Sequence, residues 1–278
     1  KFMQITIMTK LFTALFLVFF IQASAQFYYY PLPRSNKDYK RFETTGIKIC
    51  YEYKISDGEK YLASILEYGS KGLPAVWYEK GTDDNGDSVT LSETTFKYNP
   101  DLTLQSTTTD DAESGSSTTH YTYNKNRQLI KKEYASIDPP TYTYKYNTNG
   151  QLAEIKVSIK IPDYDEDGNA TGKSFNRPQS KMTYKYDKLN RIIEEWYYLA
   201  GENGDFSQNP DYKTKWSYNS ESLVSRIEQA DSEGYIISST ILEYNQSGLL
   251  ISLLKKSGDE TEQYKYEYCT DCKQSWMK

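Results

Sequence analysis

The chain has 278 residues, a formal net charge of −5, 37% hydrophobic residues and 28 tyrosines. The acidic balance argues against nucleic acid and anionic membrane surfaces as main partners, because both attract basic proteins. The length suffices for a sizeable core or an extended repeat array, and tyrosine suits a sheet face with apolar bodies and polar tips.

Residues 1–25 are predicted to be a signal peptide. Lys10 precedes an uninterrupted apolar run at 11–21, and Ala23-Ser24-Ala25 has the small-x-small pattern of a signal peptidase site. The run is too short to span a bilayer as a helix, and an N-terminal membrane anchor is the alternative interpretation. We expect an exported protein, in the periplasm, at the cell surface or secreted, with no membrane span in the mature chain. Removing two lysines changes the formal charge from −5 to −7.

After a leading segment and strand at 26–60, one unit recurs through residues 61–268. It reads aromatic-x-Tyr, then Asn, Asp or Gly, a short turn, and an aliphatic residue near the sixth position after the Tyr. We call this unit the kernel. Its copies lie at 66–74, 96–104, 121–129, 144–152, 184–192, 216–224 and 242–250, with a degenerate eighth at 264–268.

Each kernel predicts a β-hairpin. The aromatic positions lie two apart and the positions between them are polar, which is the period of a strand with one aromatic face. The Asn or Asp can hydrogen-bond its own turn, and Gly or Asn four residues after the Tyr tolerates a left-handed backbone. Leu102, Arg127 and Ser222 break this rule, which makes their turns candidates for a different geometry.

The predicted fold is therefore all-β, with tandem hairpins forming one curved or spiralling antiparallel sheet and its tyrosines on the concave side. Polar connectors are expected to be loops on one rim, and the Ser/Thr/Asp-rich segment 105–119 is expected to be mobile. These connectors lie at 80–90, 105–119, 135–141, 158–180, 199–213 and 229–234.

The kernel resembles the Tyr-x-Tyr-Asp-x-x-Gly-Arg-Leu repeat of the Rhs/YD family. YKYDKLNRI at 184–192 and YKYNTNGQL at 144–152 are the most similar copies, and Arg191 stands where the family often has Arg. Large family members form spiralling β-shells around a toxin polypeptide, or cell-surface proteins that bind partners and carbohydrate. The resemblance implies a repeat fold and an exported, surface-associated setting. This array is too short for a complete shell, and no recognisable toxin domain follows it.

No catalytic constellation is evident. His120 is the single histidine, and no nucleophile elbow, Walker loop or dinucleotide-binding glycine motif is present. Paired carboxylates could serve a hydrolase, but the acids concentrate in turns and on the wet face. We therefore do not expect an enzyme.

One loop could hold calcium. Asp163, Asp165 and Asp167, with Gly168, match the start of an EF-hand-type loop. Ser174 stands where the bidentate Glu is needed, so affinity would be weak, and a solvated loop tip is the alternative. No other cofactor is expected.

The cysteines and tryptophans complete the candidates. Cys50, Cys269 and Cys272 could form a structural disulfide in an oxidising compartment, with residues 269–278 as a C-terminal CxxC tail. The pairing cannot be read from sequence. Aromatic side chains could stack on sugar rings or simply pack the sheet; the tryptophans considered are Trp77, Trp196 and Trp216.

The resulting hypothesis is a binding module at the cell envelope for a glycan, cell-wall material or a protein. The alternative is a truncated or accessory component of an Rhs-type toxin-delivery system, and a hydrolase is the third possibility. The sequence does not define the oligomeric state.

Overall fold

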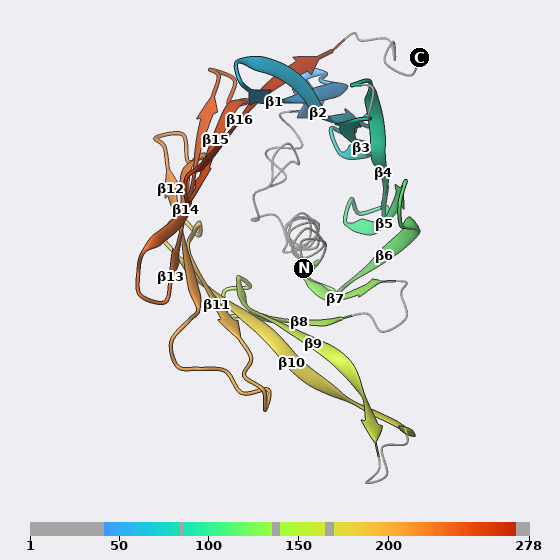
Figure 1. The fold of residues 1–278 in the computed structure, drawn as a ribbon, viewed down its shortest axis with the longest axis vertical. Coiled ribbons are helices and arrows are strands. Elements are labelled where there is room, and N and C mark those ends of the chain that lie inside the picture. Colours follow the sequence, from blue (N-terminus) through green and yellow to red (C-terminus); the bar gives the residue numbers. More distant parts are fainter. Residues whose placement is uncertain (1–41, 84–85, 135–139, 165–169, 271–278) are drawn as a thin grey trace.

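The structure is a computed structural model that describes residues 42–83, 86–134, 140–164 and 170–270. Sixteen strands form one antiparallel sheet, which curls into a nearly closed, barrel-like ring (Figure 1). A single helical turn at residues 42–45 precedes the first strand. The all-β prediction is confirmed, and the sheet bends further than the sequence could specify.

The strands follow one another through the chain as an up-and-down meander. The first eight are β1 (Ile49–Ser56), β2 (Glu59–Tyr68), β3 (Pro74–Thr82), β4 (Ser88–Tyr98), β5 (Leu104–Asp111), β6 (Gly115–Tyr123), β7 (Leu129–Tyr134) and β8 (Thr141–Tyr146). The second eight are β9 (Leu152–Tyr164), β10 (Ala170–Tyr186), β11 (Ile192–Leu199), β12 (Tyr212–Tyr218), β13 (Val224–Asp231), β14 (Ile236–Tyr244), β15 (Leu250–Ser257) and β16 (Glu260–Cys269).

No helix in these described ranges is both long and apolar enough to cross a bilayer.

Every complete kernel forms the turn of a hairpin. The seven kernels join β2 to β3, β4 to β5, and so on to β14 and β15. The degenerate eighth copy ends β16, and within the described residues no return strand of its own pairs with it. β1 takes that place, because it pairs with β16 on one side and β2 on the other. The strand from the start of the described chain therefore completes the last repeat and joins the two ends of the array.

The ring has one seam, between β7 and β8. These strands end the order of the hydrogen-bonded sheet, and no main-chain ladder joins them in the residues that the structure describes. Side chains close the seam instead. The Tyr146 hydroxyl donates to the Leu129 carbonyl at 2.8 Å, and Gln128 Nε2 donates to the Gly150 carbonyl at 3.1 Å.

The main core lies on the inner face of the ring, and a smaller cluster of Ile49, Ile65 and Tyr78 is buried on the opposite face of β1–β3. Alternate residues of each strand point inward, and the aromatic and aliphatic kernel positions form two large clusters there. The first cluster contains Phe42, Leu66, Trp216 and Tyr266, and the second contains Tyr121, Leu129, Tyr144 and Met182. The expected packing of the tyrosines on the concave side is observed.

All seven kernel turns share one geometry. In the β4–β5 turn the Asn99 N–H donates to the Thr103 carbonyl, and the Leu102 N–H donates to the Asn99 carbonyl. The same two bonds occur in the other six kernels. Leu102, Arg127 and Ser222 adopt φ of +70°, +60° and +64°. The idea that their turns differ is therefore wrong: the repeated hydrogen bonds impose the left-handed backbone on these residues too.

Several predicted loops are strands. Segment 105–119 forms most of β5 and β6, and segment 158–180 lies largely in β9 and β10. Threonine hydroxyls pair between the strands here: the Oγ1 atoms of Thr94 on β4 and Thr109 on β5 are 2.9 Å apart, and those of Thr108 on β5 and Thr118 on β6 are 3.1 Å apart. β-Branched threonine favours strands despite its polarity, which is why the composition of 105–119 misleads.

Strands β9 and β10 extend beyond the ring as a two-stranded arm (Figure 1). β8 pairs with β9 only as far as Ser158, and β11 pairs with β10 only from Ser180. Beyond these points β9 and β10 pair only with each other in the described residues.

Replacing Leu102 by Gly should stabilise the protein by roughly 0.5–1 kcal/mol, because glycine adopts positive φ without strain. The matched control is Leu189→Gly. Leu189 lies in the same kind of turn but is absent from the positive-φ positions, and it is 66% exposed. The control should be neutral or destabilising in urea unfolding. Equal effects of the two variants would contradict the strain argument.

Candidate functional site

Kernel tyrosines link neighbouring hairpins at five places. The hydroxyl of Tyr218 donates to the Ile192 carbonyl at 2.6 Å, and the hydroxyl of Tyr244 donates to the Val224 carbonyl at 2.8 Å. The same contact joins Tyr146 to Leu129, Tyr186 to Leu152 and Tyr268 to Leu250. We call these five contacts the tyrosine ladder.

The ladder satisfies carbonyls that would otherwise be buried without a partner. Ile192 and Val224 are at most 2% exposed, and the main-chain pairing of β11 with β12 and of β13 with β14 begins only after them. An unsatisfied buried carbonyl costs roughly 1–3 kcal/mol. The tyrosine therefore does more than fill the core: it supplies the hydrogen bond that the diverging strands cannot.

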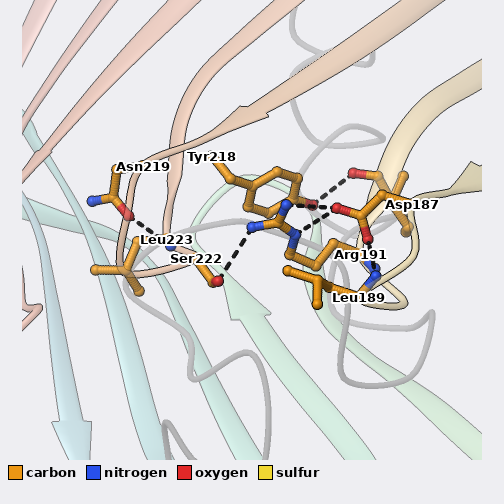
Figure 2. Close-up of polar contacts among 8 residues, drawn as sticks. Asp187, Leu189, Arg191, Tyr218, Asn219, Ser222 and Leu223 are labelled. Carbon is orange, nitrogen blue, oxygen red and sulfur yellow. Dashed lines mark hydrogen bonds and ion pairs between the residues drawn. The ribbon is translucent and has the colours of Figure 1, made fainter.

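Side chains also connect the kernel turns to one another. Figure 2 shows Arg191 between two turns: its guanidinium binds the Asp187 carboxylate at 2.6 Å, donates to Ser222 Oγ at 3.2 Å and lies 4.4 Å from the centre of the Tyr218 ring. Partial desolvation raises the pKa of Asp187, but hydrogen bonds from the Arg191 backbone and side chain outweigh it and lower the pKa overall. Arg191 thus has a structural role at this rim.

A shallow groove of about 440 Å³ lies on the same rim. It is lined by residues of the β4–β5 turn and of β6, including Asn99, Asp101, Tyr121 and Tyr123. Asp101 is held by two hydrogen bonds from Thr103, at 3.1 Å from the backbone and 2.7 Å from the hydroxyl. The groove is therefore built from turn residues that already bond to each other.

A row of acids and hydroxyls crosses the inner wall. Tyr266, Glu52, Ser64, Glu79 and Ser92 occupy successive cross-strand positions on β16, β1, β2, β3 and β4. Ser64 donates to Glu52 at 2.7 Å, Tyr266 donates to Glu52 at 3.3 Å, and Ser92 donates to Glu79 at 3.2 Å. Desolvation raises the pKa of Glu52 even though these hydroxyls favour its ionised form.

Two further titratable groups on the inner wall have strongly shifted pKa values. Lys132 is 1% exposed, and burial lowers its pKa to about 6. Its Nζ donates to the Tyr134 hydroxyl and lies 4.8 Å from the centre of the Tyr142 ring, across the seam. Burial raises the pKa of Glu195 to about 7, although Tyr184 favours its ionised form.

The outer wall of β9–β12 carries aromatic side chains beside lysines. Trp196 lies on β11, and its Nε1 donates to Glu194 Oε2 at 3.0 Å. The Lys185 ammonium is 4.0 Å from the centre of the indole and the Lys213 ammonium is 5.7 Å from it. These contacts hold the Trp196 side chain in a defined position on a partly exposed surface.

The predicted site residues are dispersed through the fold. Trp216 is buried at 6% exposure, and Trp77 packs against the same core cluster. Only Trp196, of the three tryptophans considered, lies on the outer wall. His120 is exposed on β6 opposite Glu133, as expected for a solvated strand residue.

The calcium and cysteine candidates are described only in part. Asp163 accepts a hydrogen bond from Thr171 at 3.0 Å, whereas Asp165 and Asp167 lie outside the described residues. Cys50 is a buried free thiol and Cys269 is disulfide-bonded, and Cys272 also lies outside the described residues. No group of three metal-ligating side chains occurs in the described ranges. Weak calcium binding stays a prediction.

The sequence did not predict the buried lysine on the inner wall or the cluster of aromatic residues and lysines on the outer wall. Lys132 sits next to the kernel at 121–129 in an apparently exposed stretch, and only the seam buries it. The aromatic and lysine cluster outside β9–β12 depends on strand register. The signal that could have found it is the alternation of lysines with aromatic residues in 181–198.

Comparison with known proteins supports the fold. A porin-like protein from Bacteroides uniformis has a TM-score of 0.50 at 13% identity, covering 80% of this chain and 98% of that one. A porin-like protein from Bacteroides vulgatus has a TM-score of 0.42 at 12% identity, covering 80% and 99%.

The TcdB2-TccC3 protein without its hypervariable C-terminal region has a TM-score of 0.24 at 13% identity. That match covers 74% of this chain and 12% of the other. Only the first of the three scores bears on the architecture, and it shows an all-β, barrel-like fold alone. No protein-family model and no curated protein matches the chain.

Replacing Tyr218 by Phe should destabilise the protein by about 1–3 kcal/mol, because it leaves the Ile192 carbonyl buried without its donor. The phenylalanine ring would keep the contact with Arg191, so the variant isolates the hydroxyl. Tyr235→Phe is the control, since Tyr235 is 69% exposed. Urea unfolding of both variants measures the difference, and similar losses would argue against the ladder.

Replacing Lys132 by Met should stabilise the protein more at pH 6.5 than at pH 8.5. The folded-state pKa of about 6 lies far below the usual lysine value of about 10.4. Between these values the unfolded chain binds one more proton than the folded chain, so wild-type stability rises with pH by up to about 1.4 kcal/mol per pH unit. The advantage of the variant should therefore grow by about 2 kcal/mol on acidification across this interval.

The control for that measurement is Lys131→Met. Lys131 is exposed and forms a surface ion pair with Glu133 at 2.6 Å. Removing such a pair should change stability by less than about 1 kcal/mol at either pH. An advantage of Lys132→Met that is the same at both pH values would show that the buried amine keeps its proton.

Proposed function

We propose that this chain is an exported, non-enzymatic binding protein of the cell envelope, with a glycan, cell-wall material or an envelope protein as its ligand. The observation that carries the proposal is the preorganised aromatic surface on the outer wall of β9–β12. Trp196 is fixed there by Glu194 and by flanking lysines. A fixed aromatic ring loses little conformational entropy on binding, and aromatic anchors dominate recognition surfaces.

The scaffold suits such a role. The tyrosine ladder and the common turn geometry hold sixteen strands in a fixed register, so a ligand meets a rigid wall. Binding sites on rigid strands are positioned more accurately than sites on loops. The surface therefore needs no closing movement to bind.

We also propose a relationship to the Rhs/YD repeat family. Its support is that seven kernels of this chain, which share the Tyr-x-Tyr pattern, also share one turn geometry and one direction of hairpin. The spiral of a large family member and the ring of this chain would then be two ways of continuing the same hairpin array.

A glycan array and a pull-down from envelope extract test the function. We expect wild-type protein to capture a ligand, and Trp196→Ala to weaken capture at least about tenfold, which corresponds to about 1.4 kcal/mol. Tyr235→Ala is the control, because it removes an exposed ring elsewhere. No capture in either assay would refute the proposal. Capture of a toxin polypeptide alone would favour the accessory role in toxin delivery.

A further inference from the structure

Two lysines face each other on the outer wall without a counter-charge. Lys156 on β9 lies directly opposite Lys181 on β10 in the register of the sheet. Neither forms an ion pair or a side-chain hydrogen bond within the described ranges. Like charges directly opposite on an antiparallel pair destabilise the sheet, so this arrangement carries a cost.

Other charged residues on β8–β13 avoid that cost. In a cross-strand row closer to the kernel turns, charges alternate from Lys185 to Glu194, Lys215 and Glu228. Lys185 binds Glu194 at 3.0 Å, and in another row Lys145 binds Glu154 at 2.7 Å. Among the described cross-strand pairs of β8–β13, Lys156 and Lys181 are therefore the only like charges that lie directly opposite each other.

A loop places an aromatic ring against this lysine pair. After β11 the chain makes a turn in which the Gly201 N–H donates to the Asp205 carbonyl, and a bridge between Ala200 and Phe206 fixes the return. The centre of the Phe206 ring lies 4.9 Å from Lys181 Nζ and 5.9 Å from Lys156 Nζ. Both ammonium groups and the ring thus converge on one place.

Tyr198 lies beneath the same place. Lys181 Nζ is 4.2 Å from the centre of the Tyr198 ring, which is 6% exposed. Trp196 and Lys213 continue the pattern on β11 and β12. Aromatic rings alternate with cations along the wall, and contacts between them hold the ammonium groups in position.

We infer that this place binds the carboxylate of an acidic glycan, an inference that rests on the proposed function. The carboxylate of a uronic acid residue would lie between Lys156 and Lys181 and neutralise their repulsion. The apolar face of its sugar ring would pack on Phe206. Trp196 and Lys213 offer a neighbouring position for the next sugar.

The overall charge of the protein favours this ligand over other polyanions. The chain has a net charge of −5, which disfavours a long polyanion that must contact the protein over a large surface. Nucleic acid needs several phosphate contacts over a large basic surface. A short acidic oligosaccharide that places a single carboxylate between Lys156 and Lys181 requires only this local cluster of cations and aromatic rings.

The test compares polygalacturonate oligosaccharides with the same oligosaccharides after full methyl esterification, by calorimetry on the full chain. The backbone is identical and only the charge differs. We expect the wild type to bind the acid form at least about tenfold more tightly than the ester. The variant Lys156→Met/Lys181→Met should lose this preference, and Phe206→Ala should weaken binding to both forms.

The control is Lys97→Met/Lys256→Met, which removes the same charge from exposed positions of β4 and β15. It should keep the preference, and melting curves of all variants should confirm that they are folded. A preference that survives in the Lys156→Met/Lys181→Met variant, or is lost equally in the control, overturns the acidic site. Equal binding of acid and ester overturns it as well but leaves glycan binding intact. Binding of no glycan or envelope ligand would refute the proposed function itself.

Discussion

The hydrogen bond from a kernel tyrosine to the carbonyl that opens the preceding return strand is the contact on which the ring depends. At the rim of the kernel turns, strands of successive hairpins diverge and their main-chain ladder stops. The tyrosine hydroxyl reaches across that gap and satisfies a buried carbonyl. At the seam between β7 and β8 it bridges two strands that share no described ladder at all. The tyrosine ladder thus joins neighbouring strands at the points where the main-chain pairing of the sheet stops.

Closure of the ring solves the problem of sheet edges. Without the pairing of β1 with β16, the strands would form two sheets with four edges, whose unpaired N–H and C=O groups invite aggregation. Pairing of β1 with β16 removes one such pair of edges. The other two edges, β7 and β8, face each other across buried side chains that include Leu129 and Tyr142. The degenerate eighth copy at 264–268 and β1 are therefore two parts of one repeat.

The sequence predicts the local structure well and the long-range structure poorly. The Tyr-x-Tyr spacing identifies all seven kernel hairpins, because strand period and turn chemistry are local properties. The turn at Leu102 shows the limit of residue preference: hydrogen bonds within the turn outweigh the strain of positive φ. The composition of the Thr-rich strands predicts loops, because it reflects the polarity of threonine and not the strand preference of its β-branched side chain. Neither the closure by β1 nor the burial of Lys132 could be predicted, since both depend on contacts between distant strands.

The position of the candidate binding surface follows from which parts of each repeat pack against their neighbours and which parts remain exposed. Side chains of the inner wall and the kernel rim pack the core, form the tyrosine ladder and connect neighbouring turns. Substitutions there would therefore disturb the adjacent hairpins. The outer wall and the connectors are free to vary. The two longest intervals between kernel tyrosines separate Tyr146 from Tyr186 and Tyr186 from Tyr218. Those intervals build the β9–β10 arm and the loop that carries Phe206, so the added residues lie where Lys156 and Lys181 meet the Phe206 ring. Rigid scaffolds generally place recognition in such variable segments, and here the invariant kernel makes that variation tolerable.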